Sequence, residues 1–229
     1  MDQTQINQLL VSYADASYKQ SLSRFGIPTD NVLGVRKPHL KSLAKSIGKN
    51  HDLAVELWNL PVHENKLLAC LLAEPKHLSR ETTWQWAISL YSWDLCDSAC
   101  MLFAKLPFAR SIAIEWIDDQ REFVRRAGLV TLTLLVVHDK KMSNDDILPF
   151  LNFVKQHATD ERNFVMKAVN WLLRQIGKRN LALHTHALAL AHELATSSAK
   201  PARWIGQNAR RELALPKQIE RLKAKDKSI

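Results

Sequence analysis

One stretch of the chain occurs twice, and the copies lie 41 residues apart. The segment 119–127 returns without a gap as 160–168. Helix-pair repeats of roughly 40–47 residues are typical of HEAT-like α-solenoids. Two unrelated amphipathic helices could share Phe, Val and Ala by chance, which is the alternative interpretation. The matched positions include Phe123/Phe164, Ala127/Ala168 and the cationic pair Arg126/Lys167.

The second copy carries two stripes at helical spacing. The apolar stripe predicts a core-facing surface and consists of Val165, Ala168, Leu172 and Ile176. The other stripe sets a tryptophan among cations and consists of Lys167, Trp171, Arg174 and Lys178. Cation–π packing without a function could explain it. A nucleic-acid surface explains it as well, since phosphates bind the cations and a base or sugar can rest on the indole.

Composition favours a helical protein with a polyanionic partner. The 229 residues contain 46% hydrophobic residues, which excludes general disorder, and only 6 glycines and 8 prolines, too few for the turns of an all-β protein. The net charge of +9 favours binding to a polyanion. Most of this charge falls in the stretch 199–229, which holds nine Lys or Arg and three Asp or Glu. No linker divides the chain, so we expect a single domain over 1–229 with a basic C-terminal end.

Other composition features predict a cytoplasmic protein, associated with the nucleoid if the source is bacterial. The polar, acidic start does not resemble a signal peptide. No apolar run approaches the ~18 residues of a membrane helix. The cysteines Cys70, Cys96 and Cys100 fit small buried hydrophobes better than a metal pair, because no CxxC spacing is present. We therefore expect no metal, no cofactor and no obligate protein partner, and a monomeric state.

The local signals predict an all-α chain of about six antiparallel helix pairs in a right-handed superhelical array. Asp2, Ser79, Ser92 and Ser143 are the expected helix caps, and 25–34 is a loop rich in turn residues. The stretch 131–137 has strand propensity, but its repeat partner is helical in pattern, so we interpret it as helix. The expected helices span 3–22, 38–47, 52–60, 63–74, 80–91, 93–105, 109–117, 121–138, 144–157, 161–178, 181–196, 201–214 and 216–225.

The helix after Ser92 carries a carboxylate in an unusual place. Asp94 is explained by the first turn, which favours negative charge. Asp97 lies a turn further in, among apolar residues, and needs a partner or a function to offset its desolvation. Trp93 is four residues earlier and shares its face. A structural ion pair between Asp97 and a cation such as Arg126 is one interpretation, and a catalytic site is the other.

The motifs of the chain resemble those of the AlkD-like DNA alkylation repair proteins, which are HEAT-repeat DNA glycosylases. The resemblance covers nearly the whole length, and its most specific parts are Trp-Asp-x-x-Asp at 93–97 and Lys-Ala-x-x-Trp at 167–171. Further matching segments are 34–41, 57–60 with 63–64, 123–128, 160–165, 167–178 and 202–205.

The resemblance implies a role for particular residues. Asp97 would be the catalytic carboxylate, Trp93 and Trp171 would flank the damaged nucleotide, and Arg126 would contact the DNA backbone near the lesion. The family removes cationic N3- and N7-alkylated purines from duplex DNA. The wider DNA-binding surface is expected to include Arg125, Lys167, Arg174, Lys178 and Arg203.

One carboxylate suffices for this chemistry. A cationic alkylated purine leaves without a general acid, so Asp97 need only stabilise an oxocarbenium-like sugar and place a water. Ordinary glycosidases use two carboxylates because their leaving group must be protonated.

Two departures from the family pattern leave other functions open. Asn170 stands where the better-known glycosylases have glycine, and the 25–34 loop is longer than theirs. A non-catalytic HEAT-like protein that binds damaged or branched DNA is the main alternative to a glycosylase. A protein–protein scaffold is the third possibility, although the charge distribution and the cations around Trp171 count against it.

Overall fold

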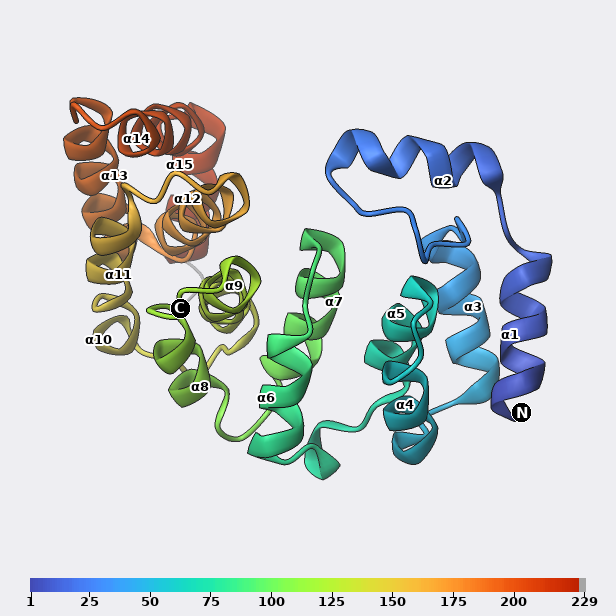
Figure 1. The fold of residues 1–229 in the computed structure, drawn as a ribbon. Helices are drawn as coiled ribbons and strands as arrows, with labels where there is room; N and C mark the ends of the chain where they lie inside the picture. Colours follow the sequence, from blue (N-terminus) through green and yellow to red (C-terminus); the bar gives the residue numbers. More distant parts are fainter. Residues whose placement is uncertain (227–229) are drawn as a thin grey trace. The chain divides into compact units, whose positions relative to one another are not determined.

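The computed structural model describes residues 1–226, and this part of the chain contains only helices, short 3₁₀ turns and loops (Figure 1). The chain divides into two compact units, Met1–Ala109 and Arg110 to the C-terminal end. Within the described residues, no helix is both long and apolar enough to cross a membrane. Of the predicted basic C-terminal end, residues 227–229 lie outside the described part.

The first unit is built from helices that pack mainly against the next or the next-but-one helix along the chain. α4 packs against α5, α5 packs against α3 and α7, and α6 packs against α7. These contacts bury an aliphatic core. The elements of this unit are α1 (Gln3–Ser12), α2 (Ala16–Leu22), η1 (Ser23–Phe25), α3 (Lys37–Ile47), α4 (His51–Trp58), α5 (His63–Leu72), η2 (Pro75–His77), α6 (Arg80–Ile88) and α7 (Trp93–Phe103).

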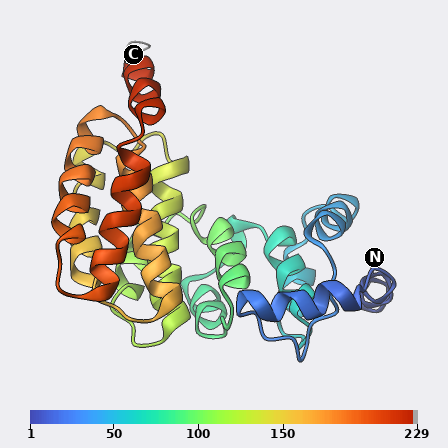
Figure 2. The same ribbon diagram turned by 90° about the horizontal axis from the view of Figure 1, so that it is seen from above.

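The second unit places its longer helices side by side (Figures 1 and 2). α12 packs against α9, α11, α13 and α14, and α13 packs against α14. The elements of this unit are α8 (Ala109–Trp116), α9 (Glu122–His138), α10 (Asn144–Ile147), α11 (Phe150–His157), α12 (Asn163–Gly177), α13 (Leu181–Ala195), α14 (Lys200–Leu213) and α15 (Pro216–Asp226).

The repeated segment forms the equivalent helices α9 and α12, as the 41-residue offset predicts. The rings of Phe123 and Phe164 lie 5.5 Å apart at the N-terminal ends of the two helices. At the C-terminal ends, Arg179 just after α12 donates to the Val136 carbonyl of α9 at 2.8 Å. The two helices are therefore parallel neighbours, and the stretch 131–137 is helical.

Two predicted helices are in fact broken. The expected helix 3–22 is interrupted before α2, where the Asp15 carboxylate accepts the Tyr18 amide at 2.9 Å and begins a new helix. The expected helix 144–157 is interrupted at Pro149, which ends α10 and occupies the N-cap of α11, because proline has no N–H to continue the ladder.

Most other helix signals are confirmed. Asp2 closes a capping box with Gln5, and Ser143 closes one with Asp146. The loop 25–34 is present between η1 and α3, and the latter ends at Gly48, whose φ is 79°.

Candidate nucleic-acid interface

Asp97 and Trp93 lie one turn apart on α7 in the first unit. Both side chains are half-buried, and their i, i+4 spacing places them on one helix face. One further turn along the same face, Met101 is 46% exposed. Arg126 belongs to the second unit, and its ion pair with Asp97 stays one of the two interpretations of Asp97.

Trp93 is held by the loop that precedes α3. Its indole N–H donates to the Phe25 carbonyl at 2.9 Å. Its ring packs against a small apolar cluster of Leu22, Ile27 and Val32. The loop 25–34, to which the sequence assigned no role, therefore orients the tryptophan of the Trp-Asp-x-x-Asp motif.

Asp94 is more than a first-turn acid, which corrects the sequence interpretation. It is buried and its carboxylate contacts His63 Nε2 at 2.9 Å. The other ring nitrogen of His63 contacts the Tyr91 hydroxyl at 2.8 Å. Ser92 occupies the N-cap as predicted, but its hydroxyl donates to Asp94 at 2.7 Å and makes no cap hydrogen bond to the backbone.

These contacts keep Asp94 ionised in a buried place. Burial is the largest influence on the pKa of Asp94 and raises it, but the hydrogen bond and charge of His63 and the hydrogen bond from Ser92 outweigh burial. The pKa therefore lies below its usual range. We conclude that Asp94 ties α7 to α5 and fixes the start of α7, which carries Trp93 in its first turn and Asp97 in its second.

A second buried carboxylate, Glu64 on α5, holds the loop. It is 1% exposed and accepts the amides of Gly34 at 2.7 Å and Val35 at 3.0 Å through Oε1. The Leu33 amide lies 3.0 to 3.1 Å from both oxygens. Gly34 has a φ of 86°, and a Cβ there would lie 2.3 Å from the Asp15 carbonyl. The loop can thus close over Glu64 only with glycine at this position.

The first unit also has a cationic pocket of about 410 Å³ beside α7. Ser98 and Met101 of α7 line it, together with aliphatic side chains of α3 and α5. The sequence places most of the net positive charge at the C-terminal end, and this pocket adds a second positive region. Its cations are Lys37, Lys41, Lys49 and Lys105.

Arg126 occupies a buried position on α9 in the second unit. Its side chain is 5% exposed, and Nη1 donates to the Phe164 carbonyl at 2.6 Å. Its repeat partner on α12, Lys167, is exposed. The two matched cations therefore differ in accessibility.

The repeat also contains an arginine–aspartate clamp before each helix. Arg121 Nε donates to Asp119 at 2.9 Å, and Arg162 Nε donates to Asp160 at the same distance. Arg125, a predicted DNA contact, bridges the two copies with a 2.8 Å contact to Asp160. Burial raises the pKa of Asp160, but its arginine partners lower it to about 2. Arg121 and Arg162 match at the same 41-residue offset in the sequence, a signal that the predicted repeat did not include.

The predicted cationic stripe of α12 is partly neutralised inside the unit. Lys167 is exposed and Trp171 is half-buried. Arg174 and Lys178 both contact Glu212 of α14, with the Lys178 Nζ to Oε1 distance at 2.6 Å. Arg174 and Lys178 therefore bring less positive potential to the surface than their number implies.

Two amides connect this stripe to its surroundings. When the Gln175 amide is oriented with its oxygen toward these donors, the oxygen accepts from Trp171 Nε1 at 3.1 Å and from Lys178 Nζ at 3.2 Å. Asn170, which departs from the family pattern, is buried and donates to Asn208 of α14 at 2.7 Å. Asn170 thus has a packing role between α12 and α14.

Arg203 contacts main-chain carbonyls, and the cysteines lie in the core. Arg203 Nη1 donates to the carbonyls of Ser197 and Ser198 at 2.8 and 3.1 Å, just after α13. The cysteines are buried, as expected of small hydrophobes, and burial raises the pKa of the Cys70 thiol.

Comparison with known proteins identifies the family. The model of a family described as DNA alkylation repair enzyme matches residues 6–213. The chain belongs to this family. No curated protein matches the chain significantly.

One solved structure shows the same fold for this DNA alkylation repair family member. It has a TM-score of 0.79 at 23% identity and covers 93% of this chain and 95% of its own. It is described as a new family of proteins related to the HEAT-like repeat DNA glycosylases with affinity for branched DNA structures. An engineered protein is more distant, with a TM-score of 0.44 at 10% identity, and the match covers 89% of this chain and 94% of that one. A designed armadillo repeat protein has a TM-score of 0.36 at 14% identity, and the match covers 86% of this chain and 99% of that one. The predicted HEAT-like α-solenoid fold is confirmed.

Two site features of this family member were not found by sequence reasoning. The buried carboxylates Asp94 and Glu64 support Trp93 from two directions, through His63 and through the loop. The signal was present, since acidic residues next to apolar ones need partners. The partners themselves are about 30 residues away, which a local pattern cannot reveal.

Proposed function

We propose that this chain is a DNA glycosylase that hydrolyses the N-glycosidic bond of cationic N3- and N7-alkylated purines in duplex DNA. Its membership of the DNA alkylation repair enzyme family is the observation that carries the proposal. The Trp-Asp-x-x-Asp motif on a rigidly supported α7 agrees with it.

Asp97 acts on the sugar in this mechanism. As the bond to the charged purine breaks, positive charge develops on the deoxyribose, and a nearby carboxylate stabilises it. The same carboxylate orients the attacking water. Trp93 and Trp171 contact the damaged nucleotide, and the exposed Lys167 contacts the backbone, whereas Arg126 is buried against the Phe164 carbonyl and holds α9 to α12.

A second function is supported by the relative with affinity for branched DNA structures. In that case the basic surfaces bind junctions and Asp97 takes no part in bond cleavage. The two functions differ in one measurable product, the released base.

The test uses duplex DNA with N7-methylguanine and N3-methyladenine, and mass spectrometry of released bases. Wild type should release both. Asp97→Asn should release them about 10²–10³ times more slowly, the loss expected for one preorganised electrostatic stabiliser. Asp52→Asn, the same change at an exposed first-turn position of α4, is the matched control and should match wild type.

The alternative makes the opposite forecast. A wild type that releases no base but binds a four-way junction more tightly than duplex would support the branched-DNA function. If Asp97→Asn releases base at the wild-type rate, the catalytic assignment of Asp97 is wrong.

A further inference from the structure

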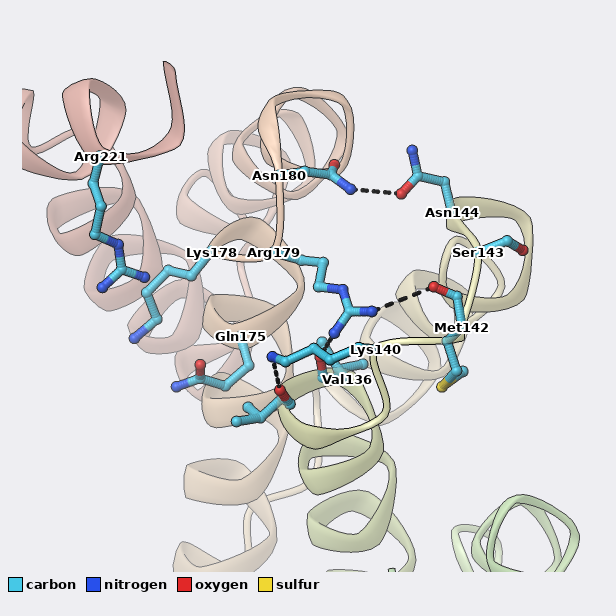
Figure 3. A pocket seen from close by; sticks show the side chains of 11 residues that line it. Val136, Lys140, Met142, Ser143, Asn144, Gln175, Lys178, Arg179, Asn180 and Arg221 are labelled. Atoms are coloured by element: carbon cyan, nitrogen blue, oxygen red, sulfur yellow. Dashed lines mark hydrogen bonds between the residues drawn. The ribbon is translucent and has the colours of Figure 1, made fainter. Parts of the chain in front are cut away.

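A second cationic pocket lies entirely within the second unit, at the C-terminal ends of α9 and α12. Its volume is about 600 Å³, and α15 contributes Arg221 to its wall. Figure 3 shows Arg221, Lys178 and Lys140 reaching into the same hollow from three segments. Only Lys178 was singled out from the sequence.

The charge of the pocket has one sign. Four cationic side chains line it, and no acidic side chain is among the described residues of its lining. The cations are Lys140, Lys178, Arg179 and Arg221. Like charges gathered in this way repel one another, so the pocket favours an anion.

Helix capping accounts for only part of this charge. Arg179 donates to the carbonyls of Val136 and Asp139, at 2.8 Å each, and Lys140 Nζ donates to Val137 at 2.5 Å. Cations at helix C-termini are favourable for this reason alone.

The remaining cations have capacity for a ligand. Lys178 contacts Glu212 at 2.6 Å, but an ammonium has three donors. Arg221 is exposed and, among the described residues, makes no hydrogen bond or ion pair. Capping therefore explains Arg179, while Lys140, Lys178 and Arg221 keep donors for an anion.

The wall of the pocket is preorganised. Arg179 also contacts the Met142 carbonyl at 3.3 Å and so holds the segment after α9. Asn180 donates to Asn144 at 2.7 Å across the same segment (Figure 3). A fixed wall lowers the ordering cost of binding.

The pocket is connected to a residue of the proposed lesion site. Gln175 lines the pocket and can bridge Trp171 Nε1 and Lys178 Nζ, at 3.1 and 3.2 Å. An anion that draws Lys178 into the pocket would change this bridge. Binding there would thus be sensed at Trp171.

We propose that this pocket holds a phosphodiester of bound DNA between Lys140, Lys178 and Arg221, and that Gln175 couples its occupancy to Trp171. The inference rests on the proposed DNA-binding function and adds an anchoring point to it. A volume of about 600 Å³ accommodates a backbone phosphate with its sugar, not only a lone ion.

The first experiment measures the salt dependence of affinity for an undamaged duplex, which needs no catalysis. Each neutralised phosphate contributes about 0.9 to the slope of log K against log salt. The double variant Lys140→Ala/Arg221→Ala should lose roughly one unit or more. The matched control, Lys141→Ala/Lys223→Ala, removes the same charge from exposed neighbours that do not line the pocket, and should change the slope by much less.

The second experiment distinguishes DNA from small phosphates. Inorganic pyrophosphate is added to wild type and to the pocket double variant, and thermal stability and the Trp171 indole NMR signal are followed. A Tm increase confined to wild type, with a Trp171 shift lost in Gln175→Leu, would support a pocket that accepts any phosphate. No pyrophosphate effect together with the slope loss would support a pocket specific for the DNA backbone.

Equal slopes for the pocket variant and its control would overturn the proposal while leaving DNA binding and base release intact. A wild type that binds no DNA at any salt would overturn the proposed function and, with it, this inference.

Discussion

Replacing Glu64 by glutamine should release the loop that supports Trp93. The buried carboxylate of Glu64 accepts the amides of Leu33, Gly34 and Val35 at 2.7 to 3.1 Å. Glutamine has the same shape but no charge, and it presents an NH₂ group where one of the oxygens stood. That NH₂ group cannot accept an amide.

The magnitude follows from these contacts. Hydrogen bonds to a charged group contribute about 1.5–3 kcal/mol each, against about 0.5–1.5 for neutral ones. Three amides that change from the first class to the second lose about 3 kcal/mol together. For a chain of this size, each kcal/mol lowers Tm by about 2–4 °C, so the expected decrease in Tm is about 6–12 °C.

Thermal unfolding and hydrogen exchange measure this effect. The amides of Leu33, Gly34 and Val35 should exchange faster in Glu64→Gln than in wild type. Glu56→Gln, at an exposed position of the neighbouring α4, is the control and should leave both quantities unchanged.

Two results would contradict this role of Glu64. If Glu64→Gln melts within ~1 °C of wild type and the three amides stay protected, the carboxylate does not hold the loop. If the amides lose protection while base release is unaltered, the loop is held by Glu64 but does not orient Trp93 for the reaction.

Three further predictions concern single side chains. Asp94→Asn should lower the unfolding free energy at pH 7 by about 1–3 kcal/mol. Because its contact with His63 helps hold the pKa of Asp94 below the usual range, the stabilisation from Asp94 is present above about pH 4 and is lost as pH falls through the lowered pKa. Urea unfolding should therefore show a smaller decrease in unfolding free energy from pH 7 to pH 3 in the variant than in wild type. Gly206→Ala would place a Cβ 2.2 Å from the Ala195 amide nitrogen. Overpacking should lower the unfolding free energy, measured by urea unfolding, by about 1–3 kcal/mol, and a variant as stable as wild type would contradict the close approach of α13 and α14. Arg203→Ala should cost about 1–2 kcal/mol through its lost carbonyl contacts and leave the DNA salt slope unchanged, whereas a slope lower by about one unit would return it to the DNA surface.

The fold was largely predictable because its signals are local or periodic. The 41-residue offset predicts the parallel packing of α9 and α12, and helix caps such as Asp2 and Ser143 begin helices where expected. The two helix predictions that were wrong also have local causes. Asp15 begins a new helix by capping it, and Pro149 interrupts a ladder that the apolar pattern continues through.

The candidate site was predictable only in part. Residue types and spacing identify Asp97 with Trp93, and Lys167 with Trp171. Spacing along one helix cannot identify partners from another, so the pairing of Asp94 with His63 was missed.

The partners also decide how much charge a cation presents. Arg174 and Lys178 share the carboxylate of Glu212, so three charged groups present a net charge of about +1. Arg179 contacts carbonyl oxygens instead, which fixes its guanidinium without cancelling its charge. A phosphate that approaches such a cation meets a preorganised full charge and loses less side-chain entropy. Arg179 therefore adds a fixed, uncancelled charge to the wall of the pocket, which Arg174 does not, although only Arg174 lies on the stripe that the sequence predicts. For this reason we expect substitutions in the pocket beside Lys178 to change the salt dependence of DNA affinity more than a substitution of Arg174 does.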